Sequence, residues 1–152
     1  MDRSSAEARL FGTLFVLGQH LTRYADDALD RYGLTARQWL LLAVLVRAFP
    51  DAPPTLTEAA AVYGTSRQNV KQIAQQLAAR GLVTLQADPA DRRATRLAVT
   101  PLVSRLFDEP EAARHQQGVV AGAFADLDDD ALSTFASLVD RCLATLREGD
   151  AS

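Results

Sequence analysis

The stretch that decides the fold is GTSRQNVKQIAQQLAARGL, residues 64–82. Ser66 is a good N-cap, because its hydroxyl can accept a hydrogen bond from a backbone N–H in the first turn of a helix. Apolar residues then recur at helical spacing along one face, at Val70, Ile73, Ala74 and Leu77. Gly81 can take the left-handed conformation that ends a helix, and Leu82 supplies the hydrophobic contact of a Schellman motif. The sequence therefore predicts a helix over 67–80 with one buried face and one polar face.

The polar face of this helix carries side chains that can contact DNA bases. They are Ser66, Arg67, Gln68, Asn69, Lys71, Gln72, Gln75 and Gln76. Arginine suits a bidentate contact with guanine, and asparagine or glutamine suits one with adenine. Polar helix faces are also common as plain solvent surface, so this face alone leaves both interpretations open.

A short helix and a tight turn precede this helix. Thr55 with Glu58, or Thr57 alone, can cap the short helix, and Gly64 fits the left-handed position at its end. Two helices joined by a short glycine-containing turn are typical of a helix-turn-helix motif.

Another helix is predicted further upstream. Thr35 and Gln38 form a capping box, and Leu34 and Trp39 stand where a hydrophobic staple needs them. This helix should run to about Phe49. The residues that then prevent its continuation are Pro50, Pro53 and Pro54.

A β-hairpin with a basic tip is predicted after the 67–80 helix. Residues 82–87 and 96–100 have the pattern of strands, with Leu97 and Val99 expected on the buried side. Between them, residues 88–94 read DPADRRA, a polar turn with a proline and two adjacent arginines.

Long helices are predicted at both ends of the chain. Near the N-terminus, apolar residues alternate at spacings of four and three at Leu10, Leu14, Leu17, Leu21, Tyr24 and Ala28. So wide an apolar surface indicates packing against a partner chain or, alternatively, a central buried helix. Thr100 and Pro101 begin another helix, which Pro110 should kink or break. A last helix after Asp128 carries on its apolar side Leu132, Phe135, Leu138, Val139, Cys142 and Leu146.

This order of elements predicts a mainly α fold with a small β-hairpin, a winged helix-turn-helix. Residues 34–100 would form the DNA-binding lobe, and residues 1–33 plus 101–152 a helical dimerisation region. An α-helix fits into the major groove of DNA, and the hairpin can lie over the adjacent backbone or minor groove.

The charge distribution agrees with a nucleic-acid partner. Residues 65–105 hold seven basic and two acidic residues, a local charge of +5, whereas the whole chain has a net charge of −3. A basic segment in an acidic chain favours local phosphate contacts. A solvated charged face is the alternative.

Several classes of function are not expected. The longest apolar run, residues 39–46, is far shorter than the roughly 20 residues that cross a bilayer, so we expect no membrane association. Without a recognisable signal peptide, the expected location is cytoplasmic. One cysteine and two histidines do not supply a structural zinc site, and no catalytic or cofactor motif appears, so we expect neither an enzyme nor a metal or cofactor.

With these motifs the sequence resembles the multiple-antibiotic-resistance regulator (MarR) family over most of its length. The segments that carry the resemblance are residues 56–60, 65–71, 77–82, 88–93 and 97–100. It implies a homodimer, with the first and last helices at the interface, that binds a pseudo-palindromic operator in double-stranded DNA. Such proteins often repress nearby genes until a small ligand or an oxidant releases them. In the family's wing motif, which Asp91 and Arg93 match, the acid orients an arginine toward the minor groove.

The expected DNA contacts follow from the helix and the hairpin together. They are Thr65, Ser66, Arg67, Gln68, Asn69, Lys71, Gln72, Asp91, Arg92 and Arg93.

The sequence also bears on how an effector could be sensed. The first helix has no cysteine, so thiol sensing is not expected, and Cys142 is expected to be a small buried core residue. A small aromatic or amphipathic ligand could bind near Phe11, Phe15, Trp39 and Phe107, although ordinary core packing also accounts for these side chains. The alternative function is a winged-helix module that docks another protein instead of reading DNA.

Overall fold

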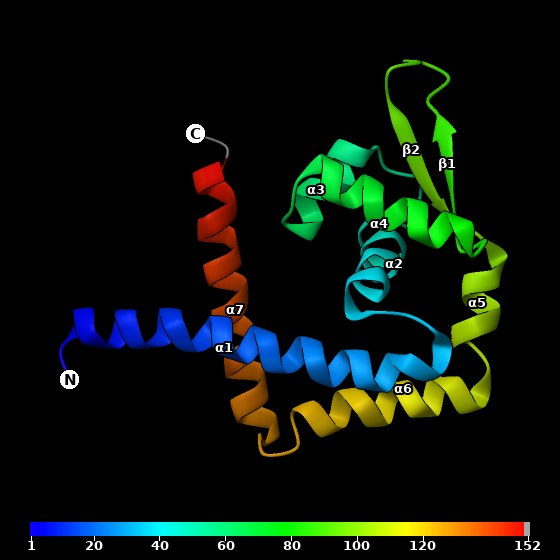
Figure 1. Cartoon of the computed structure of the whole chain (residues 1–152). Helices are drawn as coiled ribbons and strands as arrows, with labels where there is room; N and C mark the ends of the chain where they lie inside the picture. Colours follow the sequence, from blue (N-terminus) through cyan, green and yellow to red (C-terminus); the bar gives the residue numbers. More distant parts are fainter. Residues whose placement is uncertain (151–152) are drawn as a thin grey trace. The chain divides into compact units, whose positions relative to one another are not determined.

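The computed structural model describes residues 1–150, and it confirms a mainly α fold with one hairpin (Figure 1). Its contacts divide the chain into two units, residues 1–113 and the part from Arg114 onward. No helix among the described residues is long and apolar enough to cross a membrane. The elements in chain order are α1 (Arg3–Leu29), the 3-10 helix η1 (Asp30–Tyr32), α2 (Ala36–Ala48), α3 (Leu56–Tyr63), α4 (Arg67–Ala79), β1 (Val83–Ala87), β2 (Thr95–Val99), α5 (Pro101–Phe107), α6 (Pro110–Ala123) and α7 (Asp129–Asp150).

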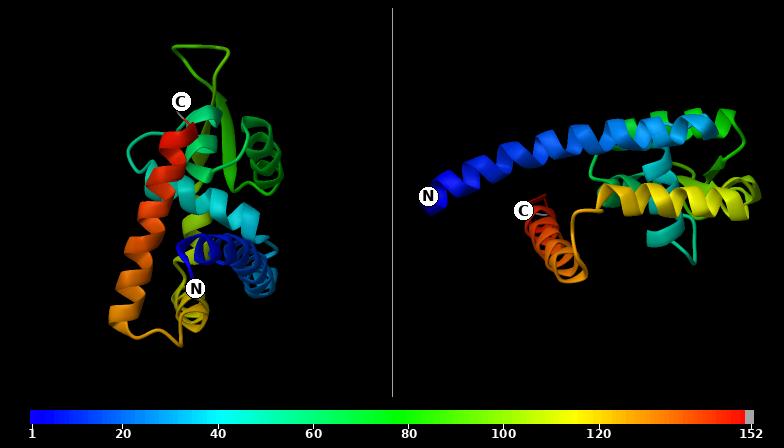
Figure 2. Two further views of the ribbon diagram at one scale, coloured as in Figure 1. Left: turned by 90° about the vertical axis from the view of Figure 1, so that its left-hand side faces the viewer. Right: turned by 90° about the horizontal axis from the view of Figure 1, so that it is seen from below.

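The core of the first unit lies among α2, α3, α4 and the hairpin, with the end of α1 packed against it. Its fully buried larger side chains are Leu41, Leu56, Leu77, Leu82, Leu97 and Val70. The predicted inner face of α4 is buried as expected, which leaves the opposite face of this helix exposed. Figure 2 shows that the N-terminal part of α1 runs beyond the helices of this core.

The predicted helix ends are confirmed. Thr35 and Gln38 form the capping box of α2, and of the two possible caps for α3 the structure has Thr55 with Glu58. Gly81 takes a φ of 73°, and the Leu82 N–H donates to the Leu77 carbonyl over 3.0 Å, which is the Schellman bond at the end of α4.

The hairpin is confirmed, with one correction. β1 and β2 pair antiparallel from Val83 opposite Val99 to Ala87 opposite Thr95. Leu97 is fully buried, but Val99 is 38% exposed, so the expectation that Val99 faces the core is wrong. Alternation in a strand identifies the face to which a side chain belongs, whereas burial also needs a neighbouring element that covers that face. In this two-stranded sheet Val99 is the last residue of its strand.

The helix that begins at Pro101 is interrupted at Pro110, as the sequence predicted. α5 ends at Phe107 and α6 begins at Pro110. The ring contact between Tyr32 and Phe107, at 5.5 Å between centroids, and the 3.5 Å ion pair between Arg31 and Glu111 join this break to η1.

In the second unit, α7 begins where it was expected to. The Asp128 carboxylate accepts a 2.8 Å hydrogen bond from the Ala131 N–H. The expectation of a buried Cys142 is wrong, because its side chain is exposed. The apolar side of α7 is itself exposed, for example at Leu138 and Leu146. Helical spacing shows which residues share a face but does not show what covers it.

The division predicted at residues 33 and 34 crosses a packed region. Leu29 and Leu34 both belong to the core of the first unit, and the Asp26 carboxylate accepts a 2.6 Å hydrogen bond from the Ala36 N–H at the start of α2. The assignment of residues 34–100 to DNA binding and of the two flanks to dimerisation stays a prediction.

Candidate nucleic-acid interface

The exposed face of α4 is the centre of the candidate interface. The helix follows α3 through a turn at Gly64, whose φ of 85° is left-handed. Because the apolar side of α4 is buried in the core, its polar side chains point toward solvent. Exposed along it are Arg67, Gln68, Asn69, Lys71, Gln72, Gln75 and Gln76.

The first turn of α4 is held by its own polar residues. The Ser66 hydroxyl accepts a 3.1 Å hydrogen bond from the Asn69 N–H, as predicted for an N-cap. The Asn69 side-chain amide also donates to the Thr65 hydroxyl over 3.0 Å. Thr65 and Ser66 therefore order the turn in which Arg67 and Asn69 are presented. An asparagine amide has two N–H groups, so this bond uses only part of the donor capacity of Asn69.

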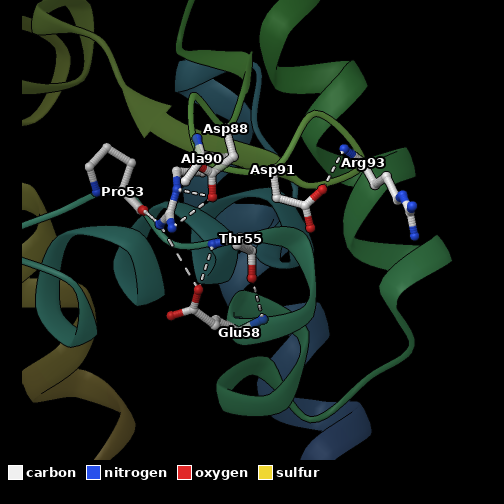
Figure 3. Close-up of polar contacts among 8 residues, drawn as sticks. Pro53, Thr55, Glu58, Asp88, Ala90, Asp91 and Arg93 are labelled. Atoms are coloured by element: carbon white, nitrogen blue, oxygen red, sulfur yellow. Dashed lines mark hydrogen bonds and ion pairs between the residues drawn. The ribbon is translucent and has the colours of Figure 1, made fainter.

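The tip of the wing is ordered by two carboxylates that bind backbone groups. Asp91 accepts a 3.0 Å hydrogen bond from the Arg93 N–H, and Asp88 accepts a 2.9 Å bond from the Ala90 N–H. Figure 3 shows Asp91 at the Arg93 backbone while the Arg93 side chain extends away from it. Asp91 thus shapes the turn from which Arg92 and Arg93 project, and both arginines are exposed.

One hollow joins the wing to the helix-turn-helix. It has a volume of about 280 Å³, and among its lining residues are Arg67 from α4 and Asp91 and Arg93 from the wing. Its other polar lining residues are Thr55 and Thr57, from the start of α3, and Thr95 of β2. Two arginines more than twenty positions apart in the sequence, Arg67 and Arg93, therefore line one site.

A second hollow, of about 310 Å³, lies beside the same helix. Asn69, Gln72 and Gln76 of α4 line it together with Asp26 of α1 and Arg37 of α2. The predicted DNA-contacting residues Asn69 and Gln72 thus also border α1 and α2.

An arginine to which the sequence assigned no individual role, Arg96, binds the base of the wing to the segment before α3. Arg96 of β2 donates from Nε to the Asp88 carboxylate over 3.0 Å and from Nη1 to the Pro53 carbonyl over 2.7 Å. Nη2 lies 3.0 Å from the same Asp88 oxygen, and Nη1 lies 4.0 Å from Glu58. The signal in the sequence is their spacing: Arg96 pairs with Gln86, two positions before Asp88, so the hairpin register makes Asp88 and Arg96 diagonal neighbours on one face.

Asp88 is charged at neutral pH. The hydrogen bond from the Ala90 N–H and that from Arg96 lower the pKa of its carboxyl below the usual range, against the effect of burial. A lowered pKa gives stability that is present above the ordinary pKa of 3.8 and is lost as the pH falls through the folded value. The contact between Asp88 and Arg96 is therefore intact across the neutral range.

Arg80 is exposed, but its guanidinium is hydrogen-bonded within the fold. From the end of α4 its guanidinium donates to the carbonyls of Gly33 and Tyr32, the latter over 2.8 Å. Two of the seven basic residues counted in 65–105, Arg80 and Arg96, are thus bonded within the protein. The others are exposed at Arg67, Lys71, Arg92, Arg93 and Arg105.

The four aromatic residues suggested for an effector lie in two different environments. Phe11 and Phe15 contact each other at 5.2 Å between ring centroids on the exposed part of α1. Trp39 and Phe107 are partly buried against the core. Neither of the two hollows beside α4 is lined by any of them.

Comparison with known proteins agrees with the fold. A model described as the MarR family matches residues 32–94. An uncharacterized protein of Mycobacterium tuberculosis is 32% identical over 124 residues, which cover 82% of each chain.

Solved structures extend the likeness to most of the chain. A MarR variant from Escherichia coli complexed with operator DNA has a TM-score of 0.75 and 18% identity, with 94% of this chain and 99% of that chain covered. BpsR from Bordetella bronchiseptica, whose DNA binding is regulated by 6-hydroxynicotinic acid, has a TM-score of 0.74 and 20% identity, with 88% and 98% covered.

Proposed function

Since this chain belongs to the MarR family of DNA-binding transcriptional regulators, which are not enzymes, we propose that it binds a pseudo-palindromic operator as a homodimer and represses transcription. In this proposal α4 enters the major groove, and the wing reaches the adjacent backbone or minor groove. The DNA contacts proposed are the ten residues expected from the sequence, which lie in the turn before α4, on α4 and at the wing tip.

One observation carries the proposal. Arg67, at the start of α4, and Arg93, at the wing tip, line the same hollow, although the two residues come from separate elements. Two exposed guanidinium groups around one surface attract phosphate, and the polar face of α4 beside them carries the residue types that read base edges.

The exposed surface of α1 supports a homodimer. Phe11 is 69% exposed and Phe15 is 67% exposed, and Leu10, Leu14 and Leu17 beside them are also exposed. An apolar surface of this length on a water-soluble helix is typical of a protein interface. A second copy of the chain is the occupant that would give two α4 helices related by a two-fold axis, as a palindromic operator requires.

The oligomeric state is a direct test of this part. We expect sedimentation equilibrium at micromolar concentration to give twice the chain mass of 16.5 kDa. Phe15→Glu places a charge in the exposed apolar surface and should shift the mass toward that of one chain, since an unpaired charge is costly to bury. Thr57→Glu, at an exposed position of α3, is the matched control for added charge. A single-chain mass for the unmodified protein at all concentrations contradicts the homodimer.

The proposal also includes a small effector. BpsR is an example of a protein of this fold whose DNA binding a small aromatic acid regulates. We propose an aromatic or amphipathic ligand near Phe11, Phe15, Trp39 and Phe107. This ligand would act by having a higher affinity for the form of the protein that cannot bind DNA than for the form that can. A tenfold loss of operator affinity needs about 1.4 kcal/mol of coupling. A set of phenolic compounds that never changes operator affinity would remove this part.

Selection from randomised duplex DNA tests the proposed function. The purified protein should enrich an inverted repeat whose half-sites lie about 10 base pairs apart, since a two-fold dimer presents its two helices one turn of DNA apart. Weak, salt-sensitive retention without enrichment of any sequence would favour the alternative, a winged-helix module that docks another protein. A reporter gene behind the selected sequence then distinguishes repression from activation.

The wing arginines should contribute affinity without base preference. We expect Arg92→Ala to weaken binding to the selected operator and to unrelated DNA alike, and to reduce the slope of log affinity against log salt by about one. Fluorescence anisotropy titrations at several salt concentrations measure both quantities. Arg47→Ala, on the exposed end of α2, removes the same charge and is the control. A loss confined to the selected operator would instead make Arg92 a base-reading residue.

A further inference from the structure

The wing is attached to the helix-turn-helix by backbone contacts and by the side chain of Arg96. The hairpin has only two strands, and it meets the segment before α3 at β2, where the Leu97 N–H donates to the Pro54 carbonyl over 2.9 Å and Thr55 forms a bridge with Arg96. The Arg96 side chain then extends this contact to the Pro53 carbonyl and toward Glu58, which belongs to the capping box of α3.

The same arginine holds the tip of the wing. Asp88, which binds both Nε and Nη2 of Arg96, is only 8% exposed and stands at the start of the turn. Its other oxygen accepts the hydrogen bond from the Ala90 N–H. A continuous set of bonds therefore runs from the start of α3 through Arg96 and Asp88 to the turn that carries Arg92 and Arg93.

The planar guanidinium of arginine is suited to this task. It offers five N–H donors in a fixed geometry, so one side chain can bind a carboxylate and a carbonyl in different directions. A lysine has one ammonium group and would keep the charge without this geometry. These contacts hold the Arg96 guanidinium at the base of the wing and not at its tip, where Arg92 and Arg93 are exposed.

From these contacts we infer that Arg96 is a positioning residue, which sets the place of the wing relative to α4 and so contributes to operator affinity without contacting DNA. The inference rests on the proposed function, because it needs a DNA target that the wing reaches. It goes beyond that function by assigning part of the affinity to a residue outside the interface. Asp88 is the partner through which Arg96 acts on the turn.

A double-mutant cycle separates this role from a direct contact with DNA. We expect Arg96→Gln to lower affinity for the selected operator about tenfold, a coupling within the range found for residues that share one network. In a chain that already carries Arg92→Ala and Arg93→Ala, the same substitution should change affinity less than twofold, because the wing then has no guanidinium groups to position. Arg47→Gln is the control for the lost charge, and we expect it to leave affinity unchanged in both backgrounds.

Hydrogen exchange distinguishes positioning from a general loss of stability. In Arg96→Gln, backbone amides of residues 84–95 should exchange faster while those of α4 keep their protection, since local opening is confined to the element that lost its attachment. A general loss of stability would raise exchange in both. Arg96→Lys keeps the charge with less disturbance of folding, and it should show the same pattern to a smaller degree.

Each result bears on the inference. It is supported if the loss of affinity vanishes in the wing-deficient background and if faster exchange is confined to the wing. It is overturned if the losses add, if Arg96→Gln binds the operator as tightly as the unmodified chain, or if α4 loses protection equally. If the unmodified chain selects no DNA sequence, the proposed function fails as well. Sequence-specific binding by the unmodified chain together with unchanged binding by Arg96→Gln removes this inference alone.

Discussion

Leu77→Ala is expected to lower the free energy of unfolding by about 2 to 5 kcal/mol, the largest stability effect that we predict for an exchange of one residue. Leu77 has no exposed surface, and it lies on the inner face of α4 among the apolar residues of the first unit. The substitution removes apolar contacts and leaves a cavity that the surrounding helices fill only in part. Because total stabilities are typically about 5 to 15 kcal/mol, a loss of this size is a large share.

Urea denaturation followed by circular dichroism measures this effect. Gln75→Ala is the matched control, since Gln75 lies two positions earlier on the exposed side of the same helix. Alanine is a good helix former, so we expect the control to change the free energy of unfolding by less than about 0.5 kcal/mol. Equal losses in the two variants would contradict the packing of α4 described above. The measurement should use a concentration at which the oligomeric state is known, because association adds to apparent stability.

Arg67→Ala should cost about 1 to 3 kcal/mol of operator binding and relax the base preference at one position of each half-site. Arg67 is the first residue of α4, it is exposed, and it lies at the hollow shared with Arg93. An arginine there can form two hydrogen bonds with the edge of a guanine, and alanine forms none. Competition between the selected operator and single-base variants of it measures both the loss and the relaxed preference.

Asn69→Ala is expected to give a loss in the same range, with a complication that the structure makes visible. The Asn69 amide donates to Thr65, so its removal also disturbs the first turn of α4. Thr65→Val removes the hydroxyl that receives this bond, so it measures the loss of the bond together with the loss of any contact of the Thr65 hydroxyl with DNA. If Arg67→Ala or Asn69→Ala weakens binding equally on all DNA, the assignment of that residue to base reading is wrong.

Elements with signals inside a few consecutive residues could be predicted from the sequence. The Ser66 cap, the capping box of Thr35 and Gln38, and the stop at Gly81 depend on bonds that span three to five residues. Such contacts form within one turn of backbone, so residue type and spacing determine them. The order of helices, the wing and the buried face of α4 followed from these signals, and with them the family.

The functions of individual polar side chains depended on contacts that spacing does not encode. Arg80 and Arg96 counted in the sequence as part of a basic surface, yet they bind carbonyls 47 and 43 residues away. A charged side chain has the same periodicity whether it faces solvent or a distant carbonyl, so only the folded chain distinguishes the two.

Contacts between elements, and not local spacing, also decided which side chains at the edges of the fold are buried. The sequence by itself determined which residues share a face: Leu97 with Val99 on β2, and Cys142 with the apolar side of α7. Only the tertiary structure decided that Leu97 is covered while Val99 and Cys142 are exposed. The physical reason is that the local backbone sets the direction of a side chain, whereas its burial depends on which other elements pack against that face.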